Sequence, residues 1–144
     1  MMMLKDVMTR DPVVIAPDAM LQEAAQVMRD IDSGVIPVCD GKRLLGMLTD
    51  RDIAVRAAAD GKDPKATPVH EVMTSDIAYC FEDDDVQKAA SAMEERQIRR
   101  LIVLDRDKGL AGIVSLGDLA VHTADDRLAG EVAEAVSEPA DPER

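Results

Sequence analysis

The chain has 144 residues, of which 47% are hydrophobic and 32% charged, and its net charge is −12. This composition excludes a disordered chain and a membrane protein, and the length fits one compact domain or two very small ones. The acidic charge repels phosphate backbones and so argues against a DNA-binding protein. No apolar run could span a bilayer, and the start, MMMLKDVMTR, lacks a signal-peptide core, so we expect a cytoplasmic protein that does not bind membranes.

Each half of the sequence predicts the same order of elements: strand, helix, strand, strand, helix. The first strands are expected at 13–15 and 77–79. The helices that follow have apolar residues in the i, i+3, i+4, i+7 pattern, namely Leu21, Ala24, Ala25 and Met28 in one half and Val86, Ala89, Ala90 and Met93 in the other. The strand pairs are 35–39 with 44–48 and 101–104 with 110–114. Asp40-Gly41 predicts a hairpin turn, and the last helices should begin near Thr49 and Ser115.

The two halves are copies of each other. At an offset of 65 residues, Val7-Met8-Thr9 matches Val72-Met73-Thr74, and Ala24-Ala25 matches Ala89-Ala90. One additional residue in the loop 105–109 changes the offset to 66, so that Gly46 matches Gly112. Because the matches extend along whole units, they indicate a duplication.

The duplication defines the domain organisation that we expect. A first domain covers residues 4–60, a second covers 69–124, and an acidic C-terminal tail covers 125–144. Residues 57–68 hold Gly61, Pro64 and Pro68, which is the composition of a linker. The tail has no counterpart in the first half, and we expect a short helix at best. Deleting the chain from Gly130 onward should therefore cost little stability.

The motifs of the two copies resemble a known family. Each copy has V-M-T, then a helix with A-A-x-x-M, and the chain continues with I-P-V-C-D and with G-M-L-T-D-R-D or G-I-V-S-L-G-D. In this order, over residues 4–122, they resemble a tandem pair of CBS domains, also called a Bateman module, as in the stand-alone CBS-domain proteins of bacteria. The resemblance implies an α+β fold with two βαββα units about a pseudo-twofold axis, their sheets packed together and helices flanking them.

One motif of each copy has two readings. Thr49-x-x-Asp52 and Ser115-x-x-Asp118 have the spacing of a capping box, and from spacing alone plain helix capping is favoured about two to one. In the family, the same pattern binds nucleotides, with the aspartate on the ribose and the hydroxyl near the phosphate. The resemblance therefore assigns Thr49, Asp52, Ser115 and Asp118 to nucleotide binding, in clefts between the two CBS domains.

The remaining candidate residues make the two clefts unequal. Arg99 and Arg100 stand before a predicted strand, where the family places a basic residue against phosphate, whereas the first copy has Gly34 and Val35. The apolar residues Val13, Ile36, Pro37 and Ile77 could enclose an adenine. The family's proline is present as Pro37, but Ile102 replaces it in the second copy, which changes one wall.

The sequence contains no pattern that predicts catalysis or a metal site. Cys39 and Cys80 are too few for a zinc motif, and Cys80 is expected to be the more exposed of the two. No base–nucleophile pair or glycine-rich phosphate loop is present, so we do not expect an enzyme. The function implied is a regulatory module that senses AMP, ADP or ATP, with NAD or S-adenosylmethionine ranked below them, and needs no cofactor. It would act as a homodimer and signal to an unknown regulated protein by a conformational change. The alternative is a stress-response or interaction scaffold whose clefts bind nothing.

Overall fold

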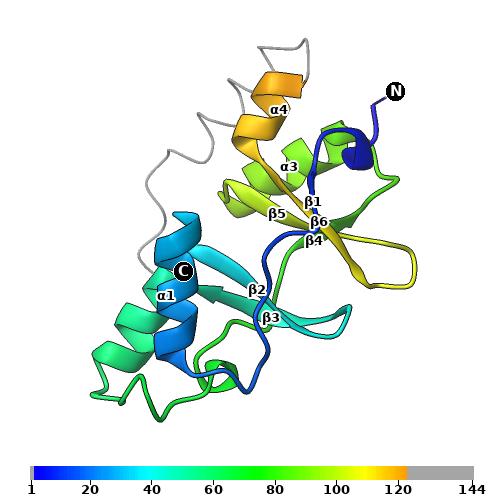
Figure 1. Ribbon diagram of the computed structural model, residues 1–144. Coiled ribbons are helices and arrows are strands. Elements are labelled where there is room, and N and C mark those ends of the chain that lie inside the picture. The colour runs from blue at the N-terminus through cyan, green and yellow to red at the C-terminus, as the bar shows by residue number, and fades with distance from the viewer. Residues whose placement is uncertain (1, 123–144) are drawn as a thin grey trace. The chain divides into compact units, whose positions relative to one another are not determined.

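The computed structural model describes residues 2–122 of the chain, and the predictions for the tail at 125–144 lie outside these residues. The chain forms two compact units (Figure 1). Pro12–Ile77 form one of them, which we call the early unit. Residues 2–11 join residues 78–122 in the other, which we call the late unit. The segment at the start of each repeat therefore lies in the unit formed mainly by the other repeat. We call these segments, residues 4–11 and 69–77, the leading segments.

The late unit is built on a four-stranded sheet in the order β1-β6-β5-β4. The strands are β1 (Thr9–Arg10), β4 (Tyr79–Phe81), β5 (Arg100–Leu104) and β6 (Leu110–Ser115). β1 and β5 run antiparallel to β6, and β4 runs parallel to β5. Helices α3 (Val86–Arg96) and α4 (Leu116–His122) lie on the same side of this sheet in Figure 1 and share one core with it.

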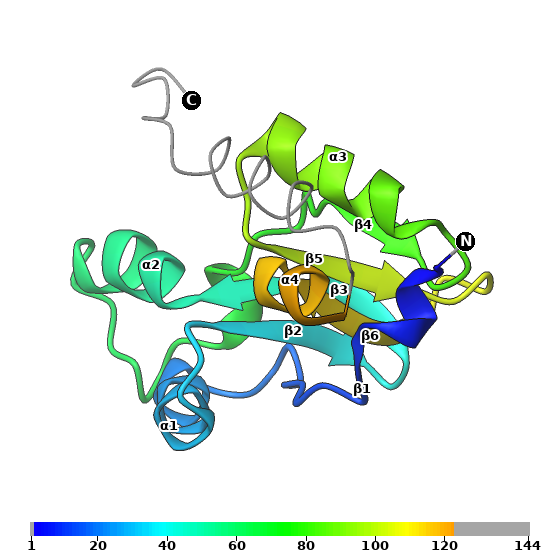
Figure 2. The same cartoon turned by 90° about the horizontal axis from the view of Figure 1, so that it is seen from above.

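The early unit repeats this order of strands with fewer hydrogen bonds. Its hairpin consists of β2 (Val35–Asp40) and β3 (Arg43–Thr49), which are antiparallel. Single bridges extend the hairpin on both sides, from Ile15 to Val38 and from Thr74 to Met47. Helix α1 (Leu21–Ile31) and the helix formed by α2 (Asp50–Asp52) with the π-helical η2 (Ile53–Ala58) accompany the hairpin, as Figure 2 shows.

The leading segments belong to the cores of the units in which they lie. Each begins with a 3-10 turn, η1 (Leu4–Asp6) in the late unit and η3 (Val69–Glu71) in the early unit. The first side chain of each turn is fully buried, since Leu4 and Val69 both have 0% exposure. Leu4 packs with the apolar side chains of α3 and β5, and Val69 with those of α1 and β2.

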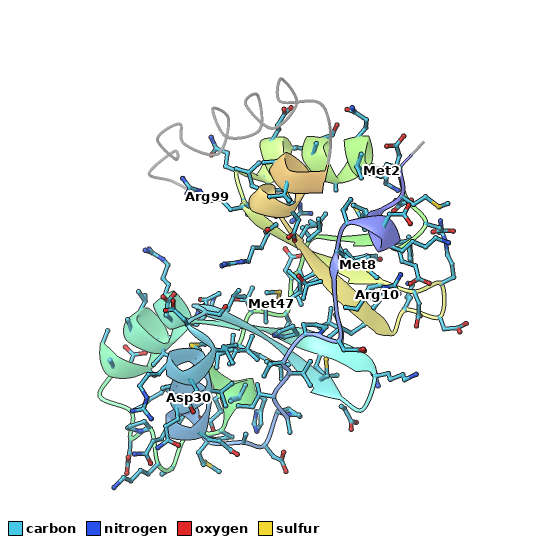
Figure 3. The ribbon with its side chains drawn as sticks, turned by 45° about the horizontal axis from the view of Figure 1, so that its top comes forward. Met2, Met8, Arg10, Asp30, Met47 and Arg99 are labelled. Atoms are coloured by element: carbon cyan, nitrogen blue, oxygen red, sulfur yellow. The ribbon has the colours of Figure 1, made fainter. Side chains whose placement is uncertain are left out.

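Close backbone contact explains a glycine that both repeats contain. A Cβ at Gly112 would lie 2.5 Å from the carbonyl oxygen of Thr9, and one at Gly46 would lie 2.7 Å from that of Thr74. A side chain at either position would push the leading segment away from the strand. Figure 3 labels Met8 and Arg10 on the leading segment beside β6. A Cβ at Gly112 would also lie 2.8 Å from the sulfur of Met8.

The predicted order of elements and the α+β class are confirmed, with two departures in the first strands. The strand expected at 13–15 is reduced to the single bridge at Ile15. Strand β4 occupies Tyr79–Phe81 rather than 77–79. Cys80 pairs with Val103 in the way Ile15 pairs with Val38, so the repeat offset of 65 applies here as well. For the same reason the exposure expected for Cys80 is wrong: its side chain is only 3% exposed.

Residues of the predicted linker cap the N-terminus of α1. The carbonyls of Pro64 and Thr67 accept hydrogen bonds from the amides of Gln22 and Leu21. These are amides of the first helical turn, which have no partner within the helix. Among residues 2–122, no helix is long and apolar enough to cross a bilayer.

Candidate functional site

Both signature motifs form complete capping boxes. In the early unit, the amide of Asp52 donates to Thr49 Oγ1 at 3.0 Å, and the amide of Thr49 donates to Asp52 Oδ2 at 3.0 Å. In the late unit, the amide of Asp118 donates to Ser115 Oγ at 3.0 Å, and the amide of Ser115 donates to Asp118 Oδ2 at 2.8 Å. The capping role expected from spacing alone is therefore present in both units, and it leaves open whether either motif also binds a ligand.

The carboxylate of Asp52 has further partners. The hydroxyl of Thr74 lies 3.2 Å from Asp52 Oδ1 and 3.4 Å from Oδ2. Arg56 Nε lies 3.9 Å from Oδ1, and the same guanidinium donates to the carbonyls of Val72 and Met73. These contacts leave Asp52 buried, with 8% exposure. Sequence reasoning missed both Thr74 and Arg56, although Arg56 stands one helical turn after Asp52, where an acid–base pair is common.

Asp118 is less enclosed than Asp52. Within residues 2–122 its carboxylate accepts one hydrogen bond, from the amide of Ser115, and its side chain is half-buried. A carboxylate offers about four acceptor positions, so most of those of Asp118 have no hydrogen-bond partner among residues 2–122. Thr9 occupies the position in its repeat that Thr74 has in the other, but it is exposed and pairs with Ile113 through its backbone.

The structure brings Arg100 and Arg99 close to this second motif. Arg100 lies directly opposite Ser115 in the β5–β6 ladder, and residues opposite each other project from the same face of a sheet. The carbonyl of Arg99 accepts a hydrogen bond from the amide of Leu116, the residue after Ser115. Both arginines are exposed. The backbone thus places both arginines beside the start of α4, where the capping box of Ser115 and Asp118 lies.

The equivalent place in the early unit has the opposite charge. Val35 lies opposite Thr49, as Arg100 lies opposite Ser115. The amide of Asp50 donates to the carbonyl of Gly34, and a Cβ at Gly34 would lie 2.7 Å from Asp50 Oδ2. An acidic side chain therefore lies where the late unit has an apolar Leu116 beside two arginines.

The four apolar candidates all belong to the early unit. Val13 is 49% exposed, and Ile77 is partly buried. Pro37 is buried in the middle of β2, and its carbonyl accepts a hydrogen bond from the amide of Ile15. Ile36 has 0% exposure because its side chain lies in the core with Leu21 and Leu48. Of the four, Val13 therefore offers the most apolar surface.

Neither cysteine is in an environment that activates a thiol. Burial raises the pKa of Cys39, and burial followed by the nearby charge of Asp84 raises the pKa of Cys80. A raised pKa keeps the thiol protonated and unreactive at neutral pH. Within residues 2–122, no three His, Cys, Asp or Glu side chains come together as ligands for a metal ion.

The two repeats of the chain match a known protein family. The sequence model of the CBS-domain family matches the chain twice, at residues 4–58 and 69–125. The chain belongs to the CBS-domain family. The resemblance predicted from the two sets of motifs is thereby confirmed.

Relatives of similar length share most of the chain. The CBS domain-containing protein YhcV of Bacillus subtilis is 42% identical over 127 residues, which are 88% of this chain and 89% of that protein. Hypoxic response protein 1 of Mycobacterium tuberculosis is 38% identical over 119 residues, 82% of each chain. These proteins, like this one, consist largely of a pair of CBS repeats.

Solved structures with the same fold include two with bound groups. The crystal structure of Hypoxic Response Protein I, with two coordinated zinc ions, has a TM-score of 0.77 and 37% identity, and covers 85% of this chain and 100% of that one. The CBS domain pair of protein MJ0100, in complex with 5′-methylthioadenosine and S-adenosyl-L-methionine, has a TM-score of 0.72 and 26% identity, and covers 83% and 98%.

Proposed function

We propose that the protein is a regulatory module that binds an adenosine-containing nucleotide through Ser115, Asp118, Arg99 and Arg100. The observation that carries this proposal is the position of Arg100 opposite Ser115, whose amide donates to the half-buried carboxylate of Asp118. The adenosine-derived ligands of the MJ0100 structure support the choice of ligand class. AMP, ADP and ATP remain the first candidates because the arginines favour a ligand with phosphate.

Each group has a task that matches its chemistry. Asp118 Oδ2 holds the amide of Ser115, and the other carboxylate oxygen can accept a ribose hydroxyl. The guanidinium of Arg100 can pair with a phosphate, which a chain of net charge −12 would otherwise repel. Arg99 and the hydroxyl of Ser115 add donors near the same phosphate. Val13, Ile36, Pro37 and Ile77 stay the candidates for apolar contacts with the adenine, and Val13 is the most exposed of them.

The pair Thr49 and Asp52 offers the less favourable binding chemistry of the two copies of the motif. It has a hydroxyl and a carboxylate in the same capping geometry, but Gly34 and Val35 stand in place of the arginines, and the acidic Asp50 lies beside Gly34. A charged hydrogen bond to phosphate contributes about 1.5–3 kcal/mol, enough for at least a tenfold preference for the late unit. The placement of these sites in clefts between the two repeats stays a prediction.

Binding would regulate a partner protein through conformation. A ligand shifts a conformational equilibrium only by its different affinity for the two states. A homodimer formed through the CBS modules, a cytoplasmic location and the absence of catalysis stay predictions. The relatives of similar length fit the last of these, since YhcV is named for its CBS domains alone. The alternative is a scaffold in stress response or protein interaction. The complete capping boxes at both motifs favour it, because they give these residues a structural role that needs no ligand.

Calorimetry with adenosine, AMP and ATP tests the proposal. Asp118→Asn should remove the tightest site. Arg100→Gln should weaken AMP at least tenfold while leaving adenosine unchanged, because only phosphate needs the guanidinium. Arg29→Gln, at an exposed arginine of α1 outside the site, is the matched control. If the wild-type protein binds none of the three ligands, or if Arg100→Gln weakens adenosine and AMP equally, the assignment is wrong, and absence of binding favours the scaffold.

A further inference from the structure

The leading segment of the second repeat has few backbone bonds to its strand. Thr74 and Met47 exchange two hydrogen bonds of 2.8 Å each, and this single bridge is the only pairing of the segment with β3 in the described chain. In the late unit the corresponding segment forms β1, in which both Thr9 and Arg10 pair with β6. Figure 3 labels Met47 on the early hairpin. Side chains must therefore contribute more to holding this segment in the early unit.

Asp52 and Arg56 provide those side-chain contacts. The carboxylate of Asp52 accepts the hydroxyl of Thr74, and Arg56 joins the same carboxylate to the carbonyls of Val72 and Met73. The segment held in this way buries Val72, which is 1% exposed, together with Val69. Asp52 thus connects the start of the α2–η2 helix to a segment that completes the core of the unit.

The same contacts occupy the groups that a ribose would need. Asp52 Oδ2 accepts the amide of Thr49, Thr74 approaches both oxygens, and Arg56 stands beside Oδ1. With 8% of Asp52 exposed, a sugar could reach the carboxylate only by displacing Thr74. That displacement would break the part-buried hydrogen bond from Thr74 to the charged carboxylate, which is costly. Asp118 has no such contact from the leading segment in the described chain.

We propose that Asp52 fastens the leading segment of the second repeat and accepts no ribose, so that each chain has one nucleotide site, at Asp118. The second half of this statement rests on the proposed function, whereas the first half does not. One copy of the duplicated motif is thus a structural connection between the repeats, and the other is the ligand site.

A double-mutant cycle tests the connection in the full chain. Asp52→Ala and Thr74→Val should each lower the folding equilibrium constant measured by denaturant unfolding. In the double variant this constant should fall about tenfold less than the product of the two single falls predicts. The matched cycle, Asp118→Ala with Thr9→Val, should show no coupling. Thr74→Ser keeps the hydroxyl and should behave like the wild type. Amide exchange at Thr74 should accelerate in Asp52→Ala and stay unchanged in Asp118→Ala.

Calorimetric stoichiometry with AMP tests the consequence for binding. We expect one AMP per chain, retained in Thr74→Val and in Asp52→Ala. Additive losses in the Asp52–Thr74 cycle would overturn the fastening role. Two AMP per chain, with one removed by Asp52→Ala, would overturn the single site. If no AMP binds while the coupling is present, the proposed nucleotide function fails and the fastening role stands.

Discussion

The early and late units share one order of strands and one capping motif, and they differ in what surrounds the aspartate of that motif. In the early unit, Asp52 is buried under Thr74 and Arg56. In the late unit, Asp118 is half-buried and caps at Ser115, the residue opposite Arg100 in the sheet. Both aspartates close a capping box, so the motif is useful to either helix without a ligand. A duplicated motif can therefore keep its structural role in one copy while the other copy becomes free to bind.

The largest expected effect tests whether each leading segment packs in the unit formed mainly by the other repeat. Leu4 is fully buried in the core of the late unit, although it precedes the first repeat in sequence. Leu4→Ala should cost about 2–5 kcal/mol, since it removes buried methyl groups and leaves a cavity. Amide exchange should accelerate at Met93 in α3 before it does at Met28 in α1. Val69→Ala should show the reverse order.

Lys5→Ala, at an exposed position of the same turn, is the control for Leu4→Ala. If Leu4→Ala accelerated exchange at Met28 and left Met93 protected, the leading segment would belong to the early unit, and the comparison between the units would have to be redrawn.

The second effect compares a glycine that faces a leading segment, Gly112, with one that does not, Gly34. Gly112→Ala should cost about 1–3 kcal/mol, because its Cβ meets the Thr9 carbonyl at 2.5 Å and backbone must move. Gly34→Ala should cost less, because its Cβ meets only the exposed, flexible side chain of Asp50. Denaturant unfolding of the two variants measures the difference. Equal costs would contradict the close approach of β1 to β6.

Local patterns in the sequence predicted the elements but not the exchange of segments. Helices with apolar residues at Leu21, Ala24 and Met28, the Asp40-Gly41 turn and both capping boxes depend on neighbours in sequence, and the structure confirms them. The pairing of Arg10 with Gly112 joins residues from opposite ends of the duplication. Because both repeats begin with the same V-M-T motif, exchanged and unexchanged segments satisfy the pattern equally.

The same limit applies to the candidate site. The sequence shows a threonine at both Thr9 and Thr74, and only the fold places one of them on an aspartate. The pairing of Arg100 with Ser115 was predictable, because in an antiparallel hairpin the start of the first strand lies beside the end of the second. The core position of Ile36 was not, since apolar residues on both faces of β2 give no alternation to read.

The third effect tests whether the two units contribute equally to the proposed homodimer. Val121 on α4 and Val55 on η2 match at the repeat offset of 66, and they are 78% and 52% exposed. Apolar side chains in the dimer contact would make Val121→Asp and Val55→Asp weaken it about tenfold, or about 1.4 kcal/mol. Sedimentation at micromolar concentration measures dissociation. Val14→Asp, which is exposed but outside these helices, is the control.

A wild-type monomer under these conditions would refute the homodimer. A loss confined to Val121→Asp would instead show that only the late unit takes part in the contact, which would extend the difference between the units to assembly.

The smallest effect concerns an ion pair that only the late unit has. Arg106 Nη2 lies 2.8 Å from Asp83 Oδ1, and its guanidinium stacks 4.2 Å from the centre of the Phe81 ring. The first repeat has Ala16 where the second has Phe81. The hydrogen bond from Arg106 lowers the pKa of Asp83 below its ordinary value. This contribution to stability is therefore complete above about pH 4 and is lost as the pH falls through the lowered pKa.

Arg106→Gln should accordingly lower Tm by a small amount at pH 7, and part of this difference should disappear as the pH falls well below 4. The pair is exposed, so the pH-dependent part should also shrink at high salt. The part that persists at low pH measures the contact with Phe81, which does not titrate. Arg43→Gln, at the matching hairpin of the early unit, should show no such pH dependence. An Arg106→Gln difference that is constant from pH 7 to below pH 3 would mean that Phe81, and not Asp83, is the partner that matters.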